Sequence, residues 1–292
     1  MEKRISGKTR LIALIGSPVE HSGSPALYNF GFAHHGLDYA YLAFDIKVDQ
    51  VPEAIKAARL LNMRGFNVTM PCKNEVAKYM DELSPAARII GAVNTVVNEN
   101  GKLVGHITDG PGFVRNLKEH GVGVENKKLV VLGAGGAATA IQVECALSGA
   151  KEVTIFNMSD EFFTRAEETA KKIENEAPGC KVKVCPLEDR SLLAEEIAKA
   201  DIVVNGTVAG MKPNEDVSLV DKEMFINMPV VVDVVYDPKK TRMMREAEEI
   251  GCVVIGGEGM LLWQGVEAYK LYTGLDMPVE EYRRFQSEQQ NK

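Results

Sequence analysis

The segment Leu129–Ala140, LVVLGAGGAATA, joins an apolar run to a glycine-rich turn of the form GxGxxA. Gly133 allows a tight turn, Gly135 lets the backbone approach a ligand, and Ala138 is small enough for helix–strand packing. Backbone N–H groups and the next helix N-terminus then face an anion. With a strand before it and another about twenty residues on, the segment predicts dinucleotide binding; the alternative is a tight strand-to-helix turn without a ligand.

The residues after the second strand should decide which dinucleotide binds. A 2′-phosphate is held by a cation, whereas a free 2′-hydroxyl is held by an acceptor. The run Asn157-Met158-Ser159-Asp160-Glu161 contains no Lys or Arg, and the usual acidic position holds Asn157. We expect Asp160 to be the acceptor, which favours NAD as the cofactor, with NADP as the less preferred one. Alternatively, Asp160 and Glu161 only favour the N-terminus of the next helix.

Transfer of a hydride from an alcohol also requires a group that takes the hydroxyl proton. Lys73, in FNVTMPCKNE, follows a predicted strand at the end where parallel sheets bind ligands. Asp109, in GHITDGPG, is a second candidate, with Asn94 of GAVNT as a further polar group. A lysine and an aspartate on one hydroxyl would form a proton relay, or the ammonium would hold the alkoxide by charge. The alternatives are a surface lysine at a helix start and an aspartate that caps the helix after Gly110.

Two further hydroxyls, those of Ser22 and Ser24, stand one glycine apart in VEHSGSP. Ser24 before Pro25 is typical of a helix N-cap with proline at the first helical position. That interpretation explains Ser24 but leaves Ser22 without a role.

The elements that position these residues alternate between β-rich and amphipathic segments, which is typical of α/β folds with a mostly parallel sheet. In the first part we expect strands at 11–15, 39–45 and 65–69, helices at 25–35, 51–61 and 75–83, and a hairpin of 93–98 and 102–105 around Asn100-Gly101.

A second series begins after Gly110-Pro111-Gly112, which predicts a hinge. A helix at 113–120 leads to strands at 128–132, 152–156, 181–186, 202–205, 230–235 and 253–255. Six strands are typical of a doubly wound, Rossmann-type dinucleotide-binding domain. A helical tail at 259–285 should pack back on the first domain. The expected domains are therefore a discontinuous substrate-binding catalytic domain, 1–112 and 259–292, and a dinucleotide-binding domain, 113–258.

The composition narrows the function classes. The chain has 292 residues and a formal net charge of −7, which argues against a nucleic-acid partner. Its five cysteines form no CxxC pair and its five histidines show no metal-ligand spacing. No apolar run approaches the roughly 20 residues of a membrane helix. We expect a cytoplasmic protein with a small-molecule substrate, no metal and no membrane partner, which could form a homodimer.

Taken together, the motifs resemble those of the shikimate/quinate dehydrogenase family over nearly the full length. The matching motifs are HSGSP, NVTMPCK, GAVNT, TDGPG, GAGGAA, NGTVAGM, DVVYDPKKT and GMLLWQG. Each motif alone is weak evidence for the family, but all eight motifs in this order are specific to it. The resemblance implies reversible oxidation of a ring hydroxyl on shikimate, or on its saturated relative quinate, to the 3-dehydro ketone. It also implies that Lys73 and Asp109 are the catalytic pair.

The resemblance further implies the roles of the remaining polar residues. Ser22 and Ser24 would bind the substrate carboxylate, on which two hydroxyls can converge, and Tyr236 would lie near it. The ring hydroxyls would be held by Asn67, Thr69, Asn94, Asp109 and Gln264, although Asn67 and Thr69 could instead satisfy backbone groups. The cofactor would contact Gly133, Ala134, Gly135, Gly136, Ala137, Asn157, Asp160, Thr207, Gly210, Met211, Val234 and Gly257.

Three positions depart from the family pattern. Ile107 replaces a common Asn before Thr-Asp-Gly, and Gly206 stands where Ala or a similar residue is usual. Met158 replaces the Arg of the Asn-Arg-Thr that NADP-using members commonly carry, which again favours NAD. Two other functions are compatible with the motifs: a dehydrogenase for a related ring acid such as an aminoshikimate, and a non-catalytic dinucleotide-responsive regulator. The presence of both Lys73 and Asp109 argues against the regulator.

Overall fold

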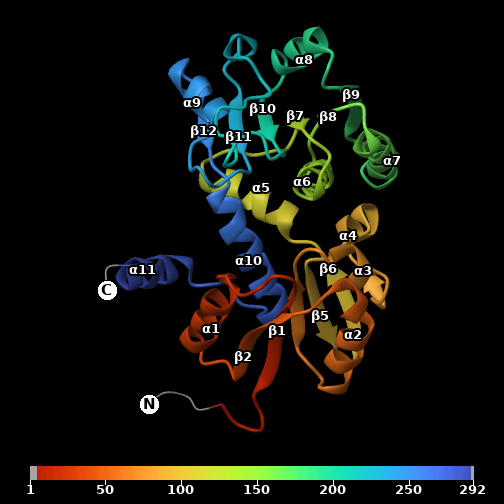
Figure 1. The fold of residues 1–292 in the computed structure, drawn as a ribbon, viewed down its shortest axis with the longest axis vertical. Coiled ribbons are helices and arrows are strands. Elements are labelled where there is room, and N and C mark those ends of the chain that lie inside the picture. The colour runs from red at the N-terminus through yellow and green to blue at the C-terminus, as the bar shows by residue number, and fades with distance from the viewer. Residues whose placement is uncertain (1–4, 291–292) are drawn as a thin grey trace. The chain divides into compact units, whose positions relative to one another are not determined.

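The computed structural model describes residues 5–290 and divides into two compact units (Figure 1). The first unit contains the described residues up to Thr108 and those from Gly265 onward, and the second is Asp109–Gln264. The chain therefore leaves the first unit and returns to it. The boundaries expected from sequence, after Gly112 and before Gly259, fall inside the first and last helices of the second unit.

The first unit is built on a six-stranded sheet. Its strands are β1 (Arg10–Gly16), β2 (Tyr39–Asp45), β3 (Gly65–Val68), β4 (Glu82–Leu83), β5 (Thr95–Glu99) and β6 (Lys102–His106), in the order β2-β1-β3-β5-β6-β4. Only β5 runs antiparallel to its neighbours, so the predicted mostly parallel sheet and the predicted hairpin are confirmed.

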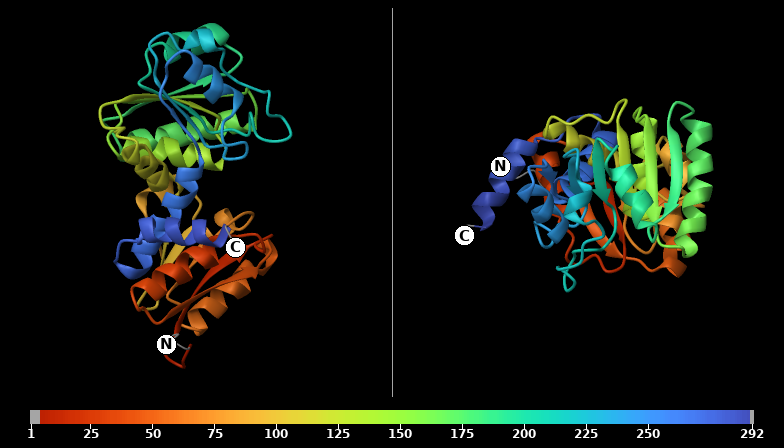
Figure 2. Two further views of the ribbon diagram at one scale, coloured as in Figure 1. Left: turned by 90° about the vertical axis from the view of Figure 1, so that its left-hand side faces the viewer. Right: turned by 90° about the horizontal axis from the view of Figure 1, so that it is seen from above.

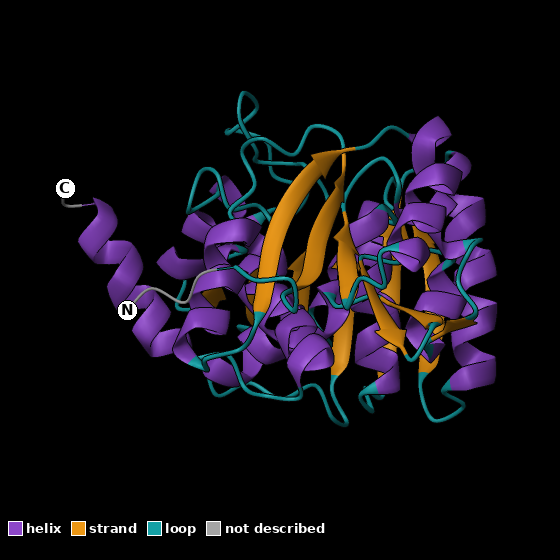
Figure 3. Cartoon of the chain, turned by 90° about the horizontal axis from the view of Figure 1, so that it is seen from below, coloured by secondary structure: helices purple, strands orange, loops and turns teal. Residues whose placement is uncertain are grey.

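Helices cover this sheet, as Figure 3 shows in purple against the orange strands. They are α1 (Ser24–His34), η1 (Val48–Gln50), α2 (Val51–Leu60), α3 (Lys73–Ala77), α4 (Pro85–Ile90) and the end of α10 (Glu258–Thr273). The last helix, α11 (Val279–Gln290), packs on α1 instead, where Tyr282 and Phe285 contact Phe30. The long helix expected at 75–83 is wrong. Glu82 and Leu83 instead pair with Val104 and Gly105 of β6, because the free edge of that strand offers backbone hydrogen bonds.

Aromatic side chains fill the core between α1, β2 and α10. The rings of Tyr28 and Tyr41 stack with centroids 4.5 Å apart, and Tyr272 meets Tyr28 edge-on at 6.0 Å. The Tyr269 hydroxyl donates to the carbonyl of Gly31 at 3.0 Å. The tail of the chain thus packs into the first unit through large, fully buried rings.

The second unit has a fully parallel six-stranded sheet, as predicted. Its strands are β7 (Lys128–Leu132), β8 (Glu152–Asn157), β9 (Lys181–Pro186), β10 (Ile202–Asn205), β11 (Val230–Asp233) and β12 (Val254–Ile255), in the doubly wound order β12-β11-β10-β7-β8-β9. Apolar side chains of these strands pack with α8 (Arg190–Ile197), η2 (Lys222–Met224) and α9 (Arg242–Glu249) in one core.

Helices α5 (Asp109–Glu119), α6 (Gly136–Leu147) and α7 (Glu161–Glu176) contact one another on the other side of this sheet (Figures 1 and 2). Gly110, Pro111 and Gly112, near which a hinge was predicted, form the first turns of α5, directly after the boundary between the two units at residues 108 and 109. A Cβ atom at Gly110 would overlap α6, and one at Gly112 would overlap the backbone of Gln264 in α10. The glycines therefore allow close helix packing rather than chain bending.

Within residues 5–290, none of the helices combines the length and apolar character of a membrane span.

Gly65, the first residue of β3, gives a test of packing in the first unit. A Cβ atom there would overlap the Val96 carbonyl oxygen and the Tyr272 ring. We expect Gly65→Ala to lower the free energy of unfolding by about 2–3 kcal/mol, because backbone on the neighbouring strand must move. Gly23→Ala is the matched control, because its Cβ would meet no atom within 4 Å. Equal stability of the two variants in urea denaturation would contradict this packing.

Candidate active site

In the first unit, the strand register brings most of the predicted substrate residues to one edge of the sheet. Parallel β1 and β3 both end there, at Gly16 and Val68. Because β5 is antiparallel, its first residue Thr95 lies at that same edge, opposite Asn67 on one side and His106 on the other. This carboxyl edge, followed by the loops after β1, β3 and β6, is where open α/β sheets bind ligands.

A buried hydrogen-bond network holds this edge together. The Asn67 amide donates to the Asn94 carbonyl at 3.2 Å and to the Thr95 hydroxyl at 3.1 Å, and its oxygen accepts from the Tyr41 hydroxyl at 2.9 Å. The Asn94 oxygen accepts from the backbone N–H of Thr108 at 2.9 Å. Asn94 therefore fixes the residue that directly precedes Asp109.

The buried hydroxyl of Tyr41 is suited to this network. Burial raises its pKa well above the usual value, so the hydroxyl stays protonated and donates to Asn67. The alternative interpretation of Asn67, that it satisfies backbone groups, fits its bond to the Asn94 carbonyl, whereas its other N–H bond goes to the side chain of Thr95. The Asn67 oxygen retains a second lone pair.

Lys73 is placed at the same edge by the loop that follows β3. It begins α3, and its carbonyl accepts from the N–H of Val93, next to Asn94. Its side chain is half-buried, as is that of Thr69. Thr69 lies so close to Gly16, which has φ +147°, that any Cβ there would overlap it. The ends of β1 and β3 thus come together with a threonine and a lysine beside them.

The two serines adopt a local turn that differs from the expected cap. Helix α1 begins at Ser24 itself, its N-cap is Gly23, and no side chain caps it. The Ser22 hydroxyl instead accepts from the N–H of Ser24 at 3.2 Å. Both hydroxyls are half-buried. The interpretation of Ser24 as an N-cap is therefore wrong, which leaves Ser22 and Ser24 together at the start of a helix.

In the second unit, the glycine-rich turn has the geometry of an anion cradle. Gly133 adopts φ +97°, and a Cβ there would overlap the methyl group of Thr207. Gly135 is the N-cap of α6 and no side chain caps the helix, so its first N–H groups are open to an anion. Cβ atoms at Gly135 and Gly136 would meet nothing within 4 Å, which leaves room for a pyrophosphate. Ala134 is buried and Ala137 half-buried beside them.

At the end of β8, the structure supports the alternative role of Asp160. Its Oδ1 accepts from the N–H groups of Phe162 and Phe163 at 2.9 and 3.3 Å and caps α7. The same atom accepts from the Asn157 amide at 2.9 Å. The carboxylate is nevertheless exposed and lies directly after the strand end where a ribose would be held.

A buried carboxylate organises the loops after β10 and β11. Asp233 accepts from the Thr241 hydroxyl at 2.6 Å, from the Val235 N–H at 2.9 Å and from the Asn205 amide at 3.0 Å. The Asn205 oxygen in turn accepts from the Thr207 hydroxyl at 2.7 Å. Burial raises the pKa of Asp233 from 3.8 to about 6, against the lowering effect of these hydrogen bonds.

The other predicted residues of the second unit lie on these loops and on α10. Gly210 has φ +84°, Met211 and Tyr236 are exposed, and Val234 is half-buried with its carbonyl in contact distance of Gly257. Gln264 donates to the Leu261 carbonyl at 3.1 Å. Asp109 starts α5. The structure therefore places Asp109, Tyr236 and Gln264 in the second unit and the other predicted substrate residues in the first.

Sequence reasoning missed the residues that support both groups. Tyr41, Thr95 and Thr108 complete the first-unit network, and Gln142 of α6 donates to the Gly133 carbonyl at 2.8 Å. Asp233 and Thr241 belong to DVVYDPKKT, where a buried Asp eight residues before a Thr gives no periodic signal. Among residues 5–290, no group of three or more His, Cys, Asp or Glu side chains could bind a metal.

The two units define the class of protein. The chain combines a doubly wound sheet that carries an open glycine cradle with a second α/β unit whose carboxyl edge carries hydroxyls, amides and a lysine. This combination is the architecture of a dinucleotide-dependent dehydrogenase.

Comparison with known proteins gives the family. Residues 14–96 match the shikimate dehydrogenase substrate binding domain, 116–236 match shikimate / quinate 5-dehydrogenase, and 257–284 match the shikimate 5′-dehydrogenase C-terminal domain. The chain belongs to the shikimate/quinate dehydrogenase family.

Individual relatives are similar over nearly the whole chain. A shikimate dehydrogenase (NADP(+)) of Listeria monocytogenes is 48% identical over 279 residues, 95% of this chain and 96% of that protein. A quinate/shikimate dehydrogenase of Escherichia coli is 44% identical over 277 residues, 94% of this chain and 96% of that protein. A crystal structure of a Listeria monocytogenes shikimate 5-dehydrogenase in complex with shikimate and NAD is 46% identical, has a TM-score of 0.93, and covers 98% of this chain and 99% of its own.

The raised pKa of Asp233 predicts a pH-dependent cost of burying its charge. Between pH ~4 and ~6 the folded state keeps a proton that the unfolded state has released, so this residue lowers stability as pH rises. We expect Asp233→Asn to remove the effect, because an amide does not ionise. Its stability relative to wild type should improve by about 2–3 kcal/mol from pH 4 to pH 7.5 in urea denaturation.

Asp201→Asn is the control, because hydrogen bonds from Lys128 and Lys127 outweigh desolvation and hold the pKa of Asp201 below 3.8. Its stability relative to wild type should not change over the same range. A constant difference between Asp233→Asn and wild type would show that Asp233 does not carry the raised pKa.

Proposed function

We propose that this protein catalyses the reversible oxidation of a ring hydroxyl of shikimate, or of quinate, to the corresponding 3-dehydro ketone. The proposal is supported by Lys73 and Asn94 at the carboxyl edge of the first-unit sheet, by Ser22 in the loop that follows β1 at that edge, and by the anion cradle of the second unit. The names of the similar proteins support the same reaction, and the Escherichia coli relative supports quinate as a second substrate. The alternative substrate is a related ring acid, because a change in one pocket contact can switch the substrate.

The ring acid would be oriented by its carboxylate. Ser22 and Ser24 offer two hydroxyl donors at the start of α1, and a carboxylate accepts several such bonds. Thr69, Asn94 and the free lone pair of Asn67 would hold ring hydroxyls at the same edge. Tyr236 and Gln264 would add contacts from the second unit.

Proton transfer would fall to Lys73 and Asp109. As the hydroxyl carbon loses its hydride, the hydroxyl proton must leave, and a paired amine and carboxylate can take it up. In the reverse direction the same pair returns the proton to the forming alkoxide. Asn94 would contribute by holding Thr108, and so the peptide that carries Asp109, in place. A non-catalytic regulator would have no need of this pair.

The dinucleotide, when bound, supplies the acceptor for the hydride. Its pyrophosphate would lie on Gly133 to Ala137, and Gly210, Met211, Val234 and Gly257 would line the nicotinamide side. The hydrogen bonds of Asp233 and Asn205 hold the loop that carries Thr207. Asp233 and Asn205 would therefore orient the cofactor through this loop rather than by direct contact.

We infer a preference for NAD from the charges at the end of β8. The N–H of Ser159 holds the Glu188 carboxylate at 3.0 Å and keeps the pKa of Glu188 below its usual value. Asp160 adds a second carboxylate, and Met158 is exposed where a cation would stand. Two negative charges disfavour a 2′-phosphate but accept from a free 2′-hydroxyl. The names of the NADP(+) relatives predict the opposite preference, so an assay with both cofactors decides between the two.

Lys73→Ala and Ser22→Ala separate chemistry from binding. We expect Lys73→Ala to lower kcat about 10²–10⁴-fold with a smaller change in KM for shikimate, because it removes a proton-transfer group. Ser22→Ala should raise KM about 10-fold with a smaller effect on kcat, because it removes a hydrogen bond to a charged group. Steady-state kinetics at saturating dinucleotide measures both. If Lys73→Ala changed only KM, Lys73 would be a binding residue and the relay would be wrong.

Met158→Arg tests the cofactor preference. Wild type should show a higher kcat/KM with NAD than with NADP, and the variant should shift this ratio toward NADP by about 10-fold, because it supplies a charged donor to a 2′-phosphate. Ile226→Arg adds the same charge to an exposed residue near the amino end of β11 and should leave the ratio unchanged. A wild-type preference for NADP would overturn the NAD proposal but not the reaction.

A further inference from the structure

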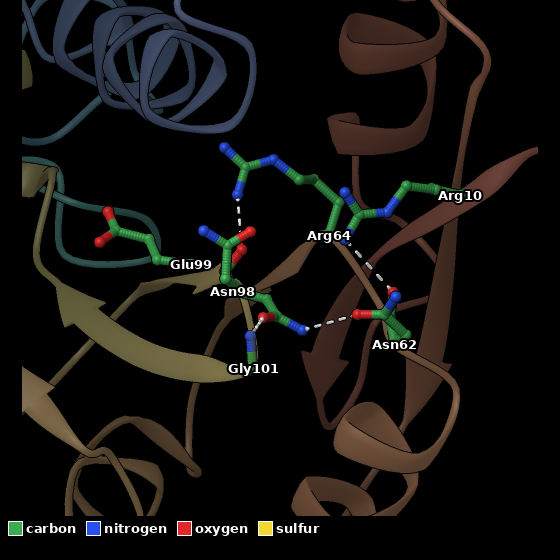
Figure 4. Close-up of a pocket in the computed structure, with 7 residues that line it drawn as sticks. Arg10, Asn62, Arg64, Asn98, Glu99 and Gly101 are labelled. Atoms are coloured by element: carbon green, nitrogen blue, oxygen red, sulfur yellow. Dashed lines mark hydrogen bonds between the residues drawn. The ribbon is translucent and has the colours of Figure 1, made fainter.

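A cavity of about 660 Å³ opens at the opposite, amino edge of the first-unit sheet (Figure 4). Its lining comes from the start of β1, the loop before β3 and the β5–β6 turn: Arg10, Asn62, Arg64, Asn98, Glu99 and Asn100-Gly101. Because β1 spans seven residues, this cavity lies about 20 Å from the carboxyl edge that carries the predicted substrate residues. It is therefore a different site of the same unit.

The guanidinium of Arg64 is held by main-chain carbonyls alone. It donates to the carbonyls of Tyr272 at 2.9 Å and Asn98 at 2.8 Å, with a longer bond to Leu271 at 3.5 Å. These bonds use three of its five N–H groups. Carbonyls orient the guanidinium, but among residues 5–290 no carboxylate pairs with its positive charge, and two donors remain for a ligand.

Arg10 approaches the cavity from the other side, and in Figure 4 its side chain extends toward the backbone of Arg64, while the Arg64 guanidinium points toward Asn98. Its one hydrogen bond, to the Asn62 carbonyl, is long at 3.4 Å. Its Nε is buried and has no hydrogen-bond partner among the described residues. An unsatisfied buried donor lowers the stability of the folded state, and more so when the group is charged. A polar ligand in the cavity, through an acceptor or a bridging water, would relieve that cost.

Among the described residues, the two arginines that line the cavity are not paired with carboxylates. Within residues 5–290, neither Arg10 nor Arg64 forms an ion pair with a carboxylate, whereas nearby Arg59 is paired with Asp81 at 2.9 Å. Glu99 is exposed at the rim and pairs with neither arginine. Both arginines line the cavity without a carboxylate partner among the described residues, and an oxyanion bound there would supply the missing negative charge.

We propose that this cavity is a binding site for a small multivalent oxyanion, a metabolite that carries phosphate or carboxylate groups. Arg10 and Arg64 supply the charge and the N–H donors, and the exposed Asn62 amide offers a further donor. The volume exceeds that of a single phosphate group, so the ligand carries additional atoms. Since Arg64 also bonds to the last turn of α10, the helix that bears Gln264, a ligand here would act on that helix from its C-terminal end.

Inorganic phosphate is the probe that tests the site. It is titrated at constant ionic strength and pH 7.5 into the full chain without dinucleotide or ring acid, and backbone amide resonances are followed by NMR. We expect saturable shifts at residues 10, 62–64 and 98–101, with a Kd on the order of 1 mM. Amides of residues 135–138 report separately on phosphate at the glycine turn, so the two sites are distinguished.

Matched variants test the proposal in two directions, because one should weaken phosphate binding and the other should tighten it. Arg10→Gln should weaken phosphate binding at least about 10-fold, because it removes a charged donor. Glu99→Gln should tighten it about 3–10-fold, because it removes a like charge beside the anion. Arg284→Gln, which changes the charge equally on α11, should leave the Kd unchanged. Arg64 is left intact, since its carbonyl bonds support the fold.

Either of two results would overturn the proposal. No saturable shift at residues 10, 62–64 and 98–101 in wild type, or shifts there that persist with the same Kd in Arg10→Gln, would exclude an oxyanion site between the two arginines.

Discussion

The hydrogen bonds of Asn67 and Asn94 are the constraint on which the first unit depends. They join β2, β3 and β5 and the chain after β6 at one point, through Tyr41, Thr95 and Thr108. All five side chains are buried, so each lost bond would leave a polar group without water. This network gives the surrounding loops a fixed frame. The Val68 N–H donates to the Asn94 carbonyl and the Lys73 carbonyl accepts from the Val93 N–H, so the segment that carries Thr69 and Lys73 is tied to this frame.

The second unit also has a buried polar cluster, built around a carboxylate instead of two amides. There one carboxylate, Asp233, accepts hydrogen bonds from both Asn205 and Thr241 and so joins the loops that follow two adjacent strands. The Asn205 oxygen in turn accepts from the Thr207 hydroxyl. A charge buried in this way is stabilised by hydrogen bonds rather than by a cation, which explains why its pKa stays near 6 instead of rising further. Both units thus hold loops at the carboxyl ends of their strands by buried polar clusters.

Periodic and local signals were sufficient to predict the fold class, the six strands of the second unit and the glycine turn. The errors arose where tertiary contacts outweigh local preference. Gly110 and Gly112 read as chain breakers, yet they lie in α5 because neighbouring helices pack against them. Residues 82–83 read as helix, but pairing with β6 made them a strand. The supporting roles of Tyr41 and Asp233 depend on partners 26 and 8 residues away, which no local pattern encodes.

The central claim is that the carboxyl edge of the first unit, held by Asn67 and Asn94, binds the ring acid. A crystal structure of the protein soaked with shikimate alone tests this most directly. The account predicts electron density with the carboxylate on the Ser22 and Ser24 hydroxyls and a ring hydroxyl within hydrogen-bond distance of the Lys73 Nζ. Shikimate bound elsewhere, or bound at this edge with its carboxylate on Lys73 and the serines empty, would contradict it.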